Sequence, residues 1–344
     1  MKFRFFSWLA AGAAAIAVSI PMTGCSPAED EVNLYSARQE PLIQPLLEQF
    51  TEETGIQVNM VTGGADSLLQ RLRHEGRNSP ADVLITTDAG RLHQAQQAGV
   101  LQAVESEILG ENIPARYRDP DGEWYGLSLR ARPILYHRDR VDPEELSTYE
   151  ALTGEQWEGR ICIRSSDNVY NQSLVAAMIA TEGVEAAEAW AAGIVNNMAR
   201  RPQGGDRDQI RAAADGVCDV AIANTYYLGL MLAGEGRDRE VAEQIGVFWP
   251  NQDDRGTHVN ISGAGVTAHA PNRDNAIRLL EFLTAQEAQQ WYAEANQEYP
   301  IRDDVPASDI LQGFGEFKSD DVDLYILGDN NSEAVRLMDR VRWR

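Results

Sequence analysis

Short apolar runs alternate with amphipathic segments along most of the chain, and this alternation limits the available folds more than any other feature. Residues 32–35 form a short apolar run, residues 42–50 place their apolar side chains on one helical face, and residues 56–60 alternate apolar and polar side chains. A longer periodic segment, 275–295, predicts one long helix. This order is typical of βαβ units and predicts an α/β fold with mixed, mostly parallel sheets flanked by helices.

The length of the chain and one interrupted segment together predict two lobes. A chain of 344 residues exceeds the size at which a single hydrophobic core usually stops growing. Between residues 124 and 141, two apolar runs are broken by Arg130, Arg132 and Pro133, as expected where a chain leaves one lobe for another. Two α/β lobes joined by extended crossings are typical of a type II periplasmic binding protein, which holds its ligand in the cleft between the lobes. The expected division is an N-terminal lobe of 31–128 with 260–298, a C-terminal lobe of 135–248 with 299–344, and interlobe crossings at 129–134 and 249–259.

The first residues have the order of a secretory signal peptide. Lys2 and Arg4 precede an apolar, alanine-rich stretch, and Met22-Thr23-Gly24-Cys25 follows it. The apolar stretch is too short for a good membrane-spanning helix. We expect residues 1–24 to be removed and the protein to be periplasmic. The four residues 22–25 resemble a lipobox, so Cys25 is a candidate lipid anchor; simple cleavage nearby is the alternative.

Two further cysteines, Cys162 and Cys218, would meet an oxidising compartment after export. A disulfide between them is one interpretation. Two buried thiols that act as small apolar side chains are the other.

The chain is strongly acidic, with a formal net charge of −23 at pH 7. Loss of Lys2 and Arg4 with the leader makes the charge more negative still. Such a surface repels nucleic acid and anionic lipid, so neither is an expected partner. The charge suits a cationic cargo, and equally suits a protein kept soluble in a saline habitat.

Three tyrosines follow two of the predicted strands directly. Residues 218–223 lead into Asn224-Thr225-Tyr226-Tyr227, and residues 161–164 lead into a turn that ends at Tyr170. In open α/β sheets, ligands bind beyond the carboxyl ends of strands. A trivalent cation stabilises phenolates strongly enough to displace their protons near neutral pH, and hard anionic oxygen suits Fe³⁺. Half-buried tyrosines bonded to backbone are the ordinary alternative for such a pair.

The sequence around these tyrosines resembles the periplasmic ferric-iron-binding protein family, including the FutA-type proteins, over nearly the whole mature length. The segments that carry the resemblance are Leu34-Tyr35-Ser36-Ala37-Arg38, Pro80-Ala81-Asp82-Val83, Thr87-Asp88-Ala89-Gly90-Arg91-Leu92, Ile161-Cys162-Ile163-Arg164-Ser165-Ser166, Tyr170-Asn171-Gln172-Ser173 and Asn224-Thr225-Tyr226-Tyr227. The resemblance implies that Tyr170, Tyr226 and Tyr227 bind Fe³⁺, and that a monomeric binding protein delivers it to the permease of an ABC importer.

The first lobe departs from the family pattern. Relatives often carry His or His-Tyr after the Tyr-Ser-Ala-Arg segment, whereas this chain has Gln39 and Glu40. Glu40 stands where some relatives have a fourth tyrosine, and its carboxylate is a candidate ligand. Gln39 offers only a neutral amide oxygen. Where some relatives use a glutamate after the strand of Asp82, the nearest positions hold Thr87 and Asp88. Either Glu40 is the first-lobe ligand, or water and a small anion complete the coordination shell.

A synergistic anion has candidate partners at the start of a predicted helix. Ser165, Ser166 and Asn168 precede it, and the free N–H groups there favour negative charge; an ordinary helix cap is the alternative role for each. The family resemblance suggests that Arg130 offsets the charge of the phenolates, whereas many arginines at such positions only pair with surface carboxylates.

Rival functions have less support in the sequence. The same fold could bind an oxyanion, a polyamine or a ferric chelate, but clustered tyrosines argue against simple organic ions. A hydrolase of the envelope would need a nucleophile with a base, and the sequence has no nucleophile elbow, zinc motif or glycine-rich phosphate loop, so we do not expect an enzyme. Five scattered histidines lack a metal-ligand spacing: His74, His93, His137, His258 and His269.

Overall fold

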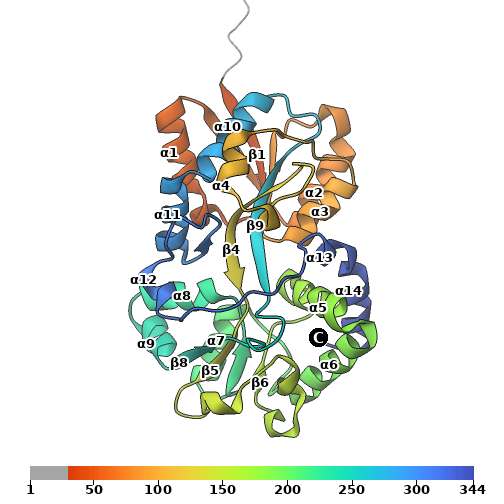
Figure 1. Cartoon of the computed structure of the whole chain (residues 1–344), viewed down its shortest axis with the longest axis vertical. Coiled ribbons are helices and arrows are strands. Elements are labelled where there is room, and N and C mark those ends of the chain that lie inside the picture. The colour runs from red at the N-terminus through yellow and green to blue at the C-terminus, as the bar shows by residue number, and fades with distance from the viewer. Residues whose placement is uncertain (1–29) are drawn as a thin grey trace, which may run out of the picture.

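The computed structural model describes residues 30–344, so the predicted leader and Cys25 lie outside the described residues. The described chain forms two sheets, each flanked by helices (Figure 1). The first sheet has the order β10-β4-β9-β3-β1-β2, and its strands are β1 (Glu31–Ser36), β2 (Gln57–Thr62), β3 (Val83–Thr86), β4 (Tyr125–Ala131), β9 (Val259–Val266) and β10 (Tyr299–Pro300). The second sheet has the order β6-β7-β5-β8, and its strands are β5 (Ile134–His137), β6 (Ile161–Cys162), β7 (Val220–Ile222) and β8 (Ile245–Phe248).

Both sheets are mixed. In the first sheet β1 runs parallel to β2 and β3, whereas β9 runs antiparallel to β3 and β4. In the second sheet β6 runs parallel to β7, and β5 runs antiparallel to β7 and β8. The carboxyl ends of β6 and β7 therefore lie side by side, which brings together the two segments that carry the tyrosines.

Helices cover each sheet in turn (Figure 1). Those around the first sheet are α1 (Gln44–Thr54), α2 (Ala65–Glu75), α3 (Ala89–Gln97), α4 (Glu107–Asn112), α10 (Arg273–Leu283) and α11 (Gln286–Asn296). Those around the second sheet are α5 (Val169–Glu182), α6 (Val184–Asn197), α7 (Asp206–Ala214), α8 (Thr225–Ala233) and α9 (Arg237–Glu243). The C-terminal part adds α12 (Asp309–Gln312), α13 (Ile326–Asp329) and α14 (Asn331–Arg340).

Helix α1 shows how the apolar spacing produces these elements. Leu46, Leu47 and Phe50 recur at helical spacing and are buried on one face. Gly55 ends the helix with φ 77°, a left-handed conformation that glycine adopts at little cost, and its N–H donates to the carbonyl oxygen of Thr51. The chain then turns into β2 as the sequence predicts.

The single long helix predicted over 275–295 is wrong, because the structure has α10 and α11 with a break between them. The Thr284 hydroxyl donates to the carbonyl oxygen of Glu281 at 3.0 Å, and Ala285 has extended backbone. A threonine side chain bonded to nearby backbone competes with helix continuation. The periodicity of apolar side chains continues across the break and conceals it.

The chain passes between the sheets where β4 leads through Arg132 and Pro133 into β5, and again between β8 and β9. The first sheet extends beyond the limits expected for the N-terminal lobe, since β4 continues to Ala131 and β10 adds Tyr299 and Pro300. Tyr299 pairs with Leu129 of β4, which is why these residues join the first sheet.

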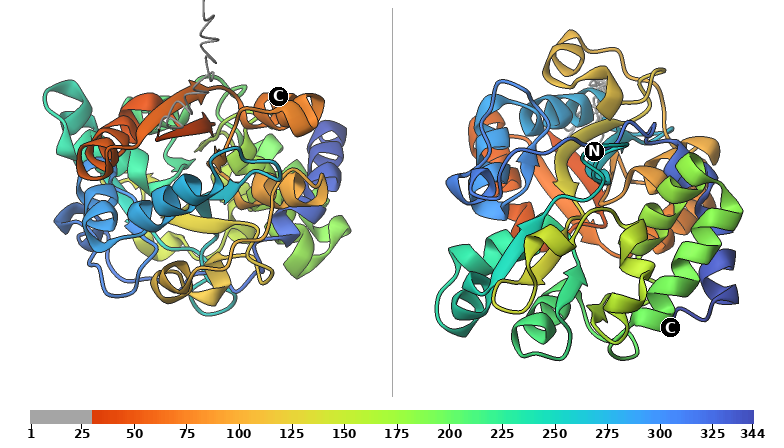
Figure 2. Two further views of the ribbon diagram at one scale, coloured as in Figure 1. Left: turned by 90° about the horizontal axis from the view of Figure 1, so that it is seen from above. Right: turned by 60° about the horizontal axis from the view of Figure 1, so that its bottom comes forward.

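The C-terminal helices connect the two halves. Helix α13 packs against both α3 and α5, and α14 packs against α5 and α6 (Figures 1 and 2). Beyond α14, Trp343 is fully buried and donates its indole N–H to the carbonyl oxygen of Arg164 at 2.8 Å. The end of the chain is thereby held against the turn that precedes α5.

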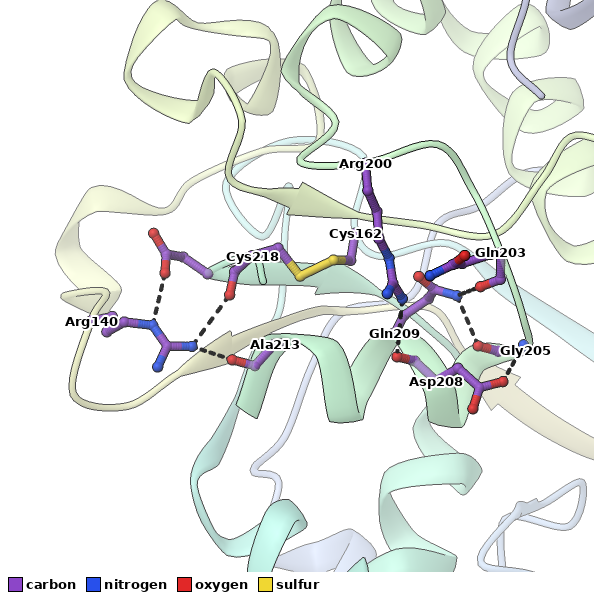
Figure 3. Close-up of a disulfide and its surroundings, with 10 residues drawn as sticks. Arg140, Cys162, Arg200, Gln203, Gly205, Asp208, Gln209, Ala213 and Cys218 are labelled. Atoms are coloured by element: carbon purple, nitrogen blue, oxygen red, sulfur yellow. Dashed lines mark hydrogen bonds and ion pairs between the residues drawn. A yellow bond between two sulfur atoms is a disulfide. The ribbon is translucent and has the colours of Figure 1, made fainter. Parts of the chain in front are cut away.

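A disulfide joins Cys162 and Cys218, so the structure favours the bond over two free thiols (Figure 3). Their Cα atoms are 5.9 Å apart, within the usual range for a disulfide. Cys162 ends β6 and Cys218 lies just before β7. The bond therefore links two neighbouring strands, each of which leads into a segment that carries tyrosine.

Candidate metal centre

The three predicted tyrosines lie in the first turns of two helices. Helix α5 begins at Val169 and places Tyr170 second, while α8 begins at Thr225 and places Tyr226 and Tyr227 next. The hydroxyl oxygens of Tyr170 and Tyr226 are 3.1 Å apart, and the ring centroids of Tyr226 and Tyr227 are 4.1 Å apart. The structure thus brings the three phenols together at the edge where β6 and β7 end.

Burial favours the neutral form of two of these phenols, Tyr226 and Tyr227. Burial, together with the neighbouring phenols Tyr170 and Tyr227, raises the pKa of Tyr226 well above its usual range. Burial and the nearby Tyr170 and Asp206 also raise the pKa of Tyr227. A bound cation would reverse the penalty, because it stabilises the phenolate directly.

Arg130 faces the same cluster from the end of β4. Its guanidinium carbon lies 5.2 Å from the centroid of the Tyr170 ring, and its Nη1 donates to the Ser262 hydroxyl at 3.1 Å. Arg130 is only 2% exposed, and its Nε and Nη2 have no hydrogen-bond partner among residues 30–344. A buried N–H without a partner costs about 1–3 kcal/mol, so this guanidinium is prepared for an anionic neighbour. Its charge lowers the pKa of Tyr226 against the effect of burial.

A buried carboxylate holds the starts of the two helices. Asp206 is fully buried, and its carboxylate accepts from Arg132 Nη1 at 3.0 Å and from Arg164 Nη1 at 2.8 Å. The same group accepts from the backbone N–H of Asn224 at 3.2 Å, and Arg132 donates to the Asn171 side chain at 2.6 Å. These contacts fix the residues adjoining the tyrosines. These contacts were not predicted from the sequence. The asparagines next to the tyrosines in both segments are the one feature of the sequence that could have indicated them.

A small cavity of about 70 Å³ lies beside the phenols. Gln39 lines it together with Tyr170 and Tyr226, so the structure places one predicted first-lobe residue next to the tyrosines. The complete lining is Ala37, Arg38, Gln39, Leu42, Thr87, Arg130, Tyr170, Tyr226, Ser262 and Glu298. Of these, Arg38, Ser262 and Glu298 were not predicted as site residues.

Glu40 is not brought to the tyrosines. Its side chain lines a separate hollow of about 470 Å³ beside β1 and β2, with Tyr35 and Arg71. The backbone of Gln39 is extended, with φ −62° and ψ 134°, Glu40 begins a short 3-10 helix (Glu40–Leu42), and the two neighbours line different spaces. The hypothesis that Glu40 is the first-lobe ligand therefore disagrees with the geometry.

The three residues predicted to hold an anion have different surroundings. Asn168 caps α5, with its side-chain oxygen accepting from the N–H of Tyr170 at 3.2 Å. Ser165 donates to the neighbouring carboxylate of Asp167, and the carbonyl oxygen of Ser166 accepts from Gln172. Asn168 also lines a second hollow of about 320 Å³ that shares lining residues with the small cavity, whereas neither serine lines either space.

The second hollow is lined by two arginines, Arg91 and Arg164, and by three carboxylates, those of Asp66, Asp88 and Asp167. Arg91 pairs with Asp66 at 2.8 Å, and Arg164 pairs with Asp206. Asp88 is engaged elsewhere, since its carboxylate caps α3 through the N–H of Arg91 at 3.0 Å and accepts from other buried side chains. Thr87, by contrast, lines both spaces.

Residues 30–344 contain no group of three or more His, Cys, Asp or Glu side chains placed to hold a metal. A site built from three or more of these side chains is therefore not found in this part of the chain.

Comparison with known proteins identifies the family of the chain. A match to the family of bacterial extracellular solute-binding proteins spans residues 46–319. The chain belongs to this family. Iron uptake protein A1 of Synechocystis sp. is 48% identical over 94% of this chain and 90% of its own length.

Two solved solute-binding structures extend the comparison. FutA from Trichodesmium, in complex with iron and citrate, shares 48% identity with a TM-score of 0.86, covering 91% of this chain and all of that one. The ferric binding protein from Campylobacter jejuni shares 41% identity with a TM-score of 0.88, covering 91% of this chain and all of that one. The predicted type II periplasmic binding fold and the predicted family resemblance are confirmed.

In the described part of this solute-binding protein, no helix has the length and apolar character needed to cross a membrane.

Proposed function

We propose that this extracellular solute-binding protein captures ferric iron through the phenolate oxygens of Tyr170, Tyr226 and Tyr227. The observation that carries the proposal is the 3.1 Å contact between the Tyr170 and Tyr226 hydroxyls, beside a buried Arg130 guanidinium with two nitrogens that lack partners among residues 30–344. Hard Fe³⁺ prefers anionic oxygen, and the described residues offer no cluster of softer ligands at this place. The role is binding and release of cargo rather than catalysis.

The charges of the site favour a trivalent cargo. The raised pKa values of Tyr226 and Tyr227 keep their phenols protonated until a strong Lewis acid displaces the protons. Three phenolates then balance the charge of Fe³⁺, and Arg130 offsets part of the repulsion among them. Asp206 holds both helix starts, so the phenols need little rearrangement when the metal arrives.

A small anion is proposed to complete the coordination shell. Asn168 and the start of α5 lie at a hollow that also contains Arg91 and Arg164, and this hollow adjoins the phenols. Guanidinium groups suit carboxylates. The Trichodesmium relative binds citrate with its iron, which makes a small polycarboxylate a reasonable choice for this chain. Gln39 can contribute only an amide oxygen.

The proposed cellular role follows from the leader and the family. A periplasmic monomer would deliver iron to the permease of an ABC importer, and Cys25 would carry the lipid that keeps it at the membrane. Cys25→Ser tests the anchor: the variant should appear in the soluble periplasmic fraction, whereas the unaltered protein should require detergent. Equal distribution of both proteins would argue against lipidation.

A visible absorption spectrum of the purified protein with Fe³⁺ tests the proposed cargo. Charge transfer from phenolate to iron colours such a complex, whereas a protein that binds an oxyanion or a polyamine stays colourless. Full retention of colour and affinity in both Tyr226→Phe and Tyr227→Phe would contradict the assignment. The control is Tyr35→Phe, because Tyr35 lines the separate hollow beside β1 and β2 and its hydroxyl donates to Glu75 at 3.0 Å.

A further inference from the structure

The proposed site has no anionic ligand from the first lobe among the residues predicted from the sequence. Glu40 lines another hollow, and Gln39 is neutral. The small cavity beside Tyr170 and Tyr226 nevertheless contains one carboxylate among its lining residues, and that carboxylate is Glu298.

Glu298 is held in place by the end of α11. Gln297 has a left-handed backbone with φ 55°, and the N–H of Glu298 donates to the carbonyl oxygen of Tyr292 at 3.2 Å. The next residue, Tyr299, begins β10 of the first sheet. Glu298 is only 3% exposed, so its carboxylate lies in the interior, at the cavity.

The two oxygens of this carboxylate have different surroundings. Oε2 accepts from Arg38 Nη2 at 2.5 Å and from the Ser128 hydroxyl at 2.7 Å. Oε1 accepts no hydrogen bond from any residue in 30–344. Two donors thus fix the orientation of the group while one oxygen stays available, which is the arrangement that a carboxylate ligand needs from its supporting contacts.

We propose that Glu298 is the first-lobe ligand of the cargo, with Oε1 binding the Fe³⁺ held by the phenolates. This inference rests on the proposed ferric function. Glu298, Tyr170 and Tyr226 line the same cavity of about 70 Å³, so an ion bound in it would lie between the carboxylate and two of the phenols. Carboxylate oxygen suits a hard cation as well as phenolate does.

The assignment changes how the lobes are joined by the metal. Tyr170 and Tyr226 belong to helices of the second sheet, whereas Glu298 adjoins β10 of the first sheet. Iron bound by both would link the lobes directly. The alternative role of Glu298 is to position Arg38. Burial lowers the pKa of Arg38, but Glu298 and the nearby phenols raise it by more, so the pKa of Arg38 rises overall.

The test compares Glu298→Gln with Glu40→Gln in the full mature protein. Both variants replace a first-lobe carboxylate by its amide, and the amide oxygen introduced by Glu298→Gln can still accept from Arg38 and Ser128. Fe³⁺ affinity is measured by competition with a calibrated chelator, and the phenolate charge-transfer band is recorded in the same samples. Glu298→Ala with and without excess acetate is the third arm, since acetate can replace a missing carboxylate ligand.

We expect Glu298→Gln to weaken Fe³⁺ binding by at least about 10-fold, the lower end of the cost of losing a supporting contact at a metal site. Its band should move to longer wavelength, because iron with fewer anionic ligands accepts electrons more readily. Glu40→Gln should match the unaltered protein, and acetate should move the Glu298→Ala band back.

An unshifted band in Glu298→Gln, with no response of Glu298→Ala to acetate, would overturn the assignment even if affinity falls, because that result is expected of a residue that only positions Arg38. An unaltered protein without any band would contradict the ferric function itself. The two failures are therefore distinguishable. Circular dichroism melting of each variant checks that it is folded.

Discussion

Lowering the pH by one unit below neutral should weaken Fe³⁺ binding by about a thousandfold, since three phenols must each release a proton. Burial raises the pKa of Tyr226 and Tyr227, so their phenols stay protonated at every pH in the test. Tyr170 shares a hydrogen bond with Tyr226 and must also lose its proton to bind. Each proton displaced costs about 1.4 kcal/mol more per unit fall in pH, and three phenols together cost about 4 kcal/mol. A site built from carboxylates of ordinary pKa would add nothing to this slope above about pH 5.

The slope is measured by titrating Fe³⁺ against a calibrated chelator across mildly acid and neutral pH, with corrections for chelator protonation and iron hydrolysis. The logarithm of the affinity should change by about three per pH unit. Tyr227→Phe should reduce this value to about two, because one proton no longer has to leave. A slope below about one in the unaltered protein would refute a site built from phenolates.

Three further predictions concern single contacts. Tyr226→Phe and Tyr227→Phe should each weaken Fe³⁺ binding by more than about 100-fold, above the range typical of outer contacts, with unchanged circular dichroism; a chelator competition that gives equal affinities would contradict this. Asp206→Asn should lower the free energy of unfolding in urea by about 3 kcal/mol, because it leaves the buried Arg132 and the partly buried Arg164 without their carboxylate, and an unchanged midpoint would show that the network is dispensable. Reduction of Cys162–Cys218 should lower the same free energy by about 4 kcal/mol, given a sequence separation of 56, and a smaller loss in the double serine variant would point to structure in the unfolded chain.

The tyrosine cluster was predictable because it depends on local order. Tyr170 and the pair Tyr226–Tyr227 each follow a short strand, and the carboxyl ends of neighbouring parallel strands meet. The α/β class and most element positions follow from spacing in the same way. The exact ends of β6 were less visible, since the predicted strand 161–164 shortens to Ile161–Cys162 before the turn into α5.

Other parts of the site depend on residues that meet only in the folded chain. Asp206 and Glu298 lie in segments that carry no recognisable motif, and each reaches the site through contacts with residues far away in sequence. Neighbours in sequence can also separate in the fold. The family resemblance makes both Gln39 and Glu40 candidate ligands, but Gln39 lines the small cavity beside the phenols and Glu40 lines the hollow beside β1 and β2.

All three phenols come from α5 and α8, which belong to the same half of the molecule. If Fe³⁺ binds these phenols as proposed, it can be loaded onto that half without any contribution from the other, so arrival of the metal and closing of the lobes would be separable events. Opening of the lobes alone would then leave the metal on its phenolates. Unloading would require a second chemical event at the iron, either proton return to the phenols or a change in the charge of the metal.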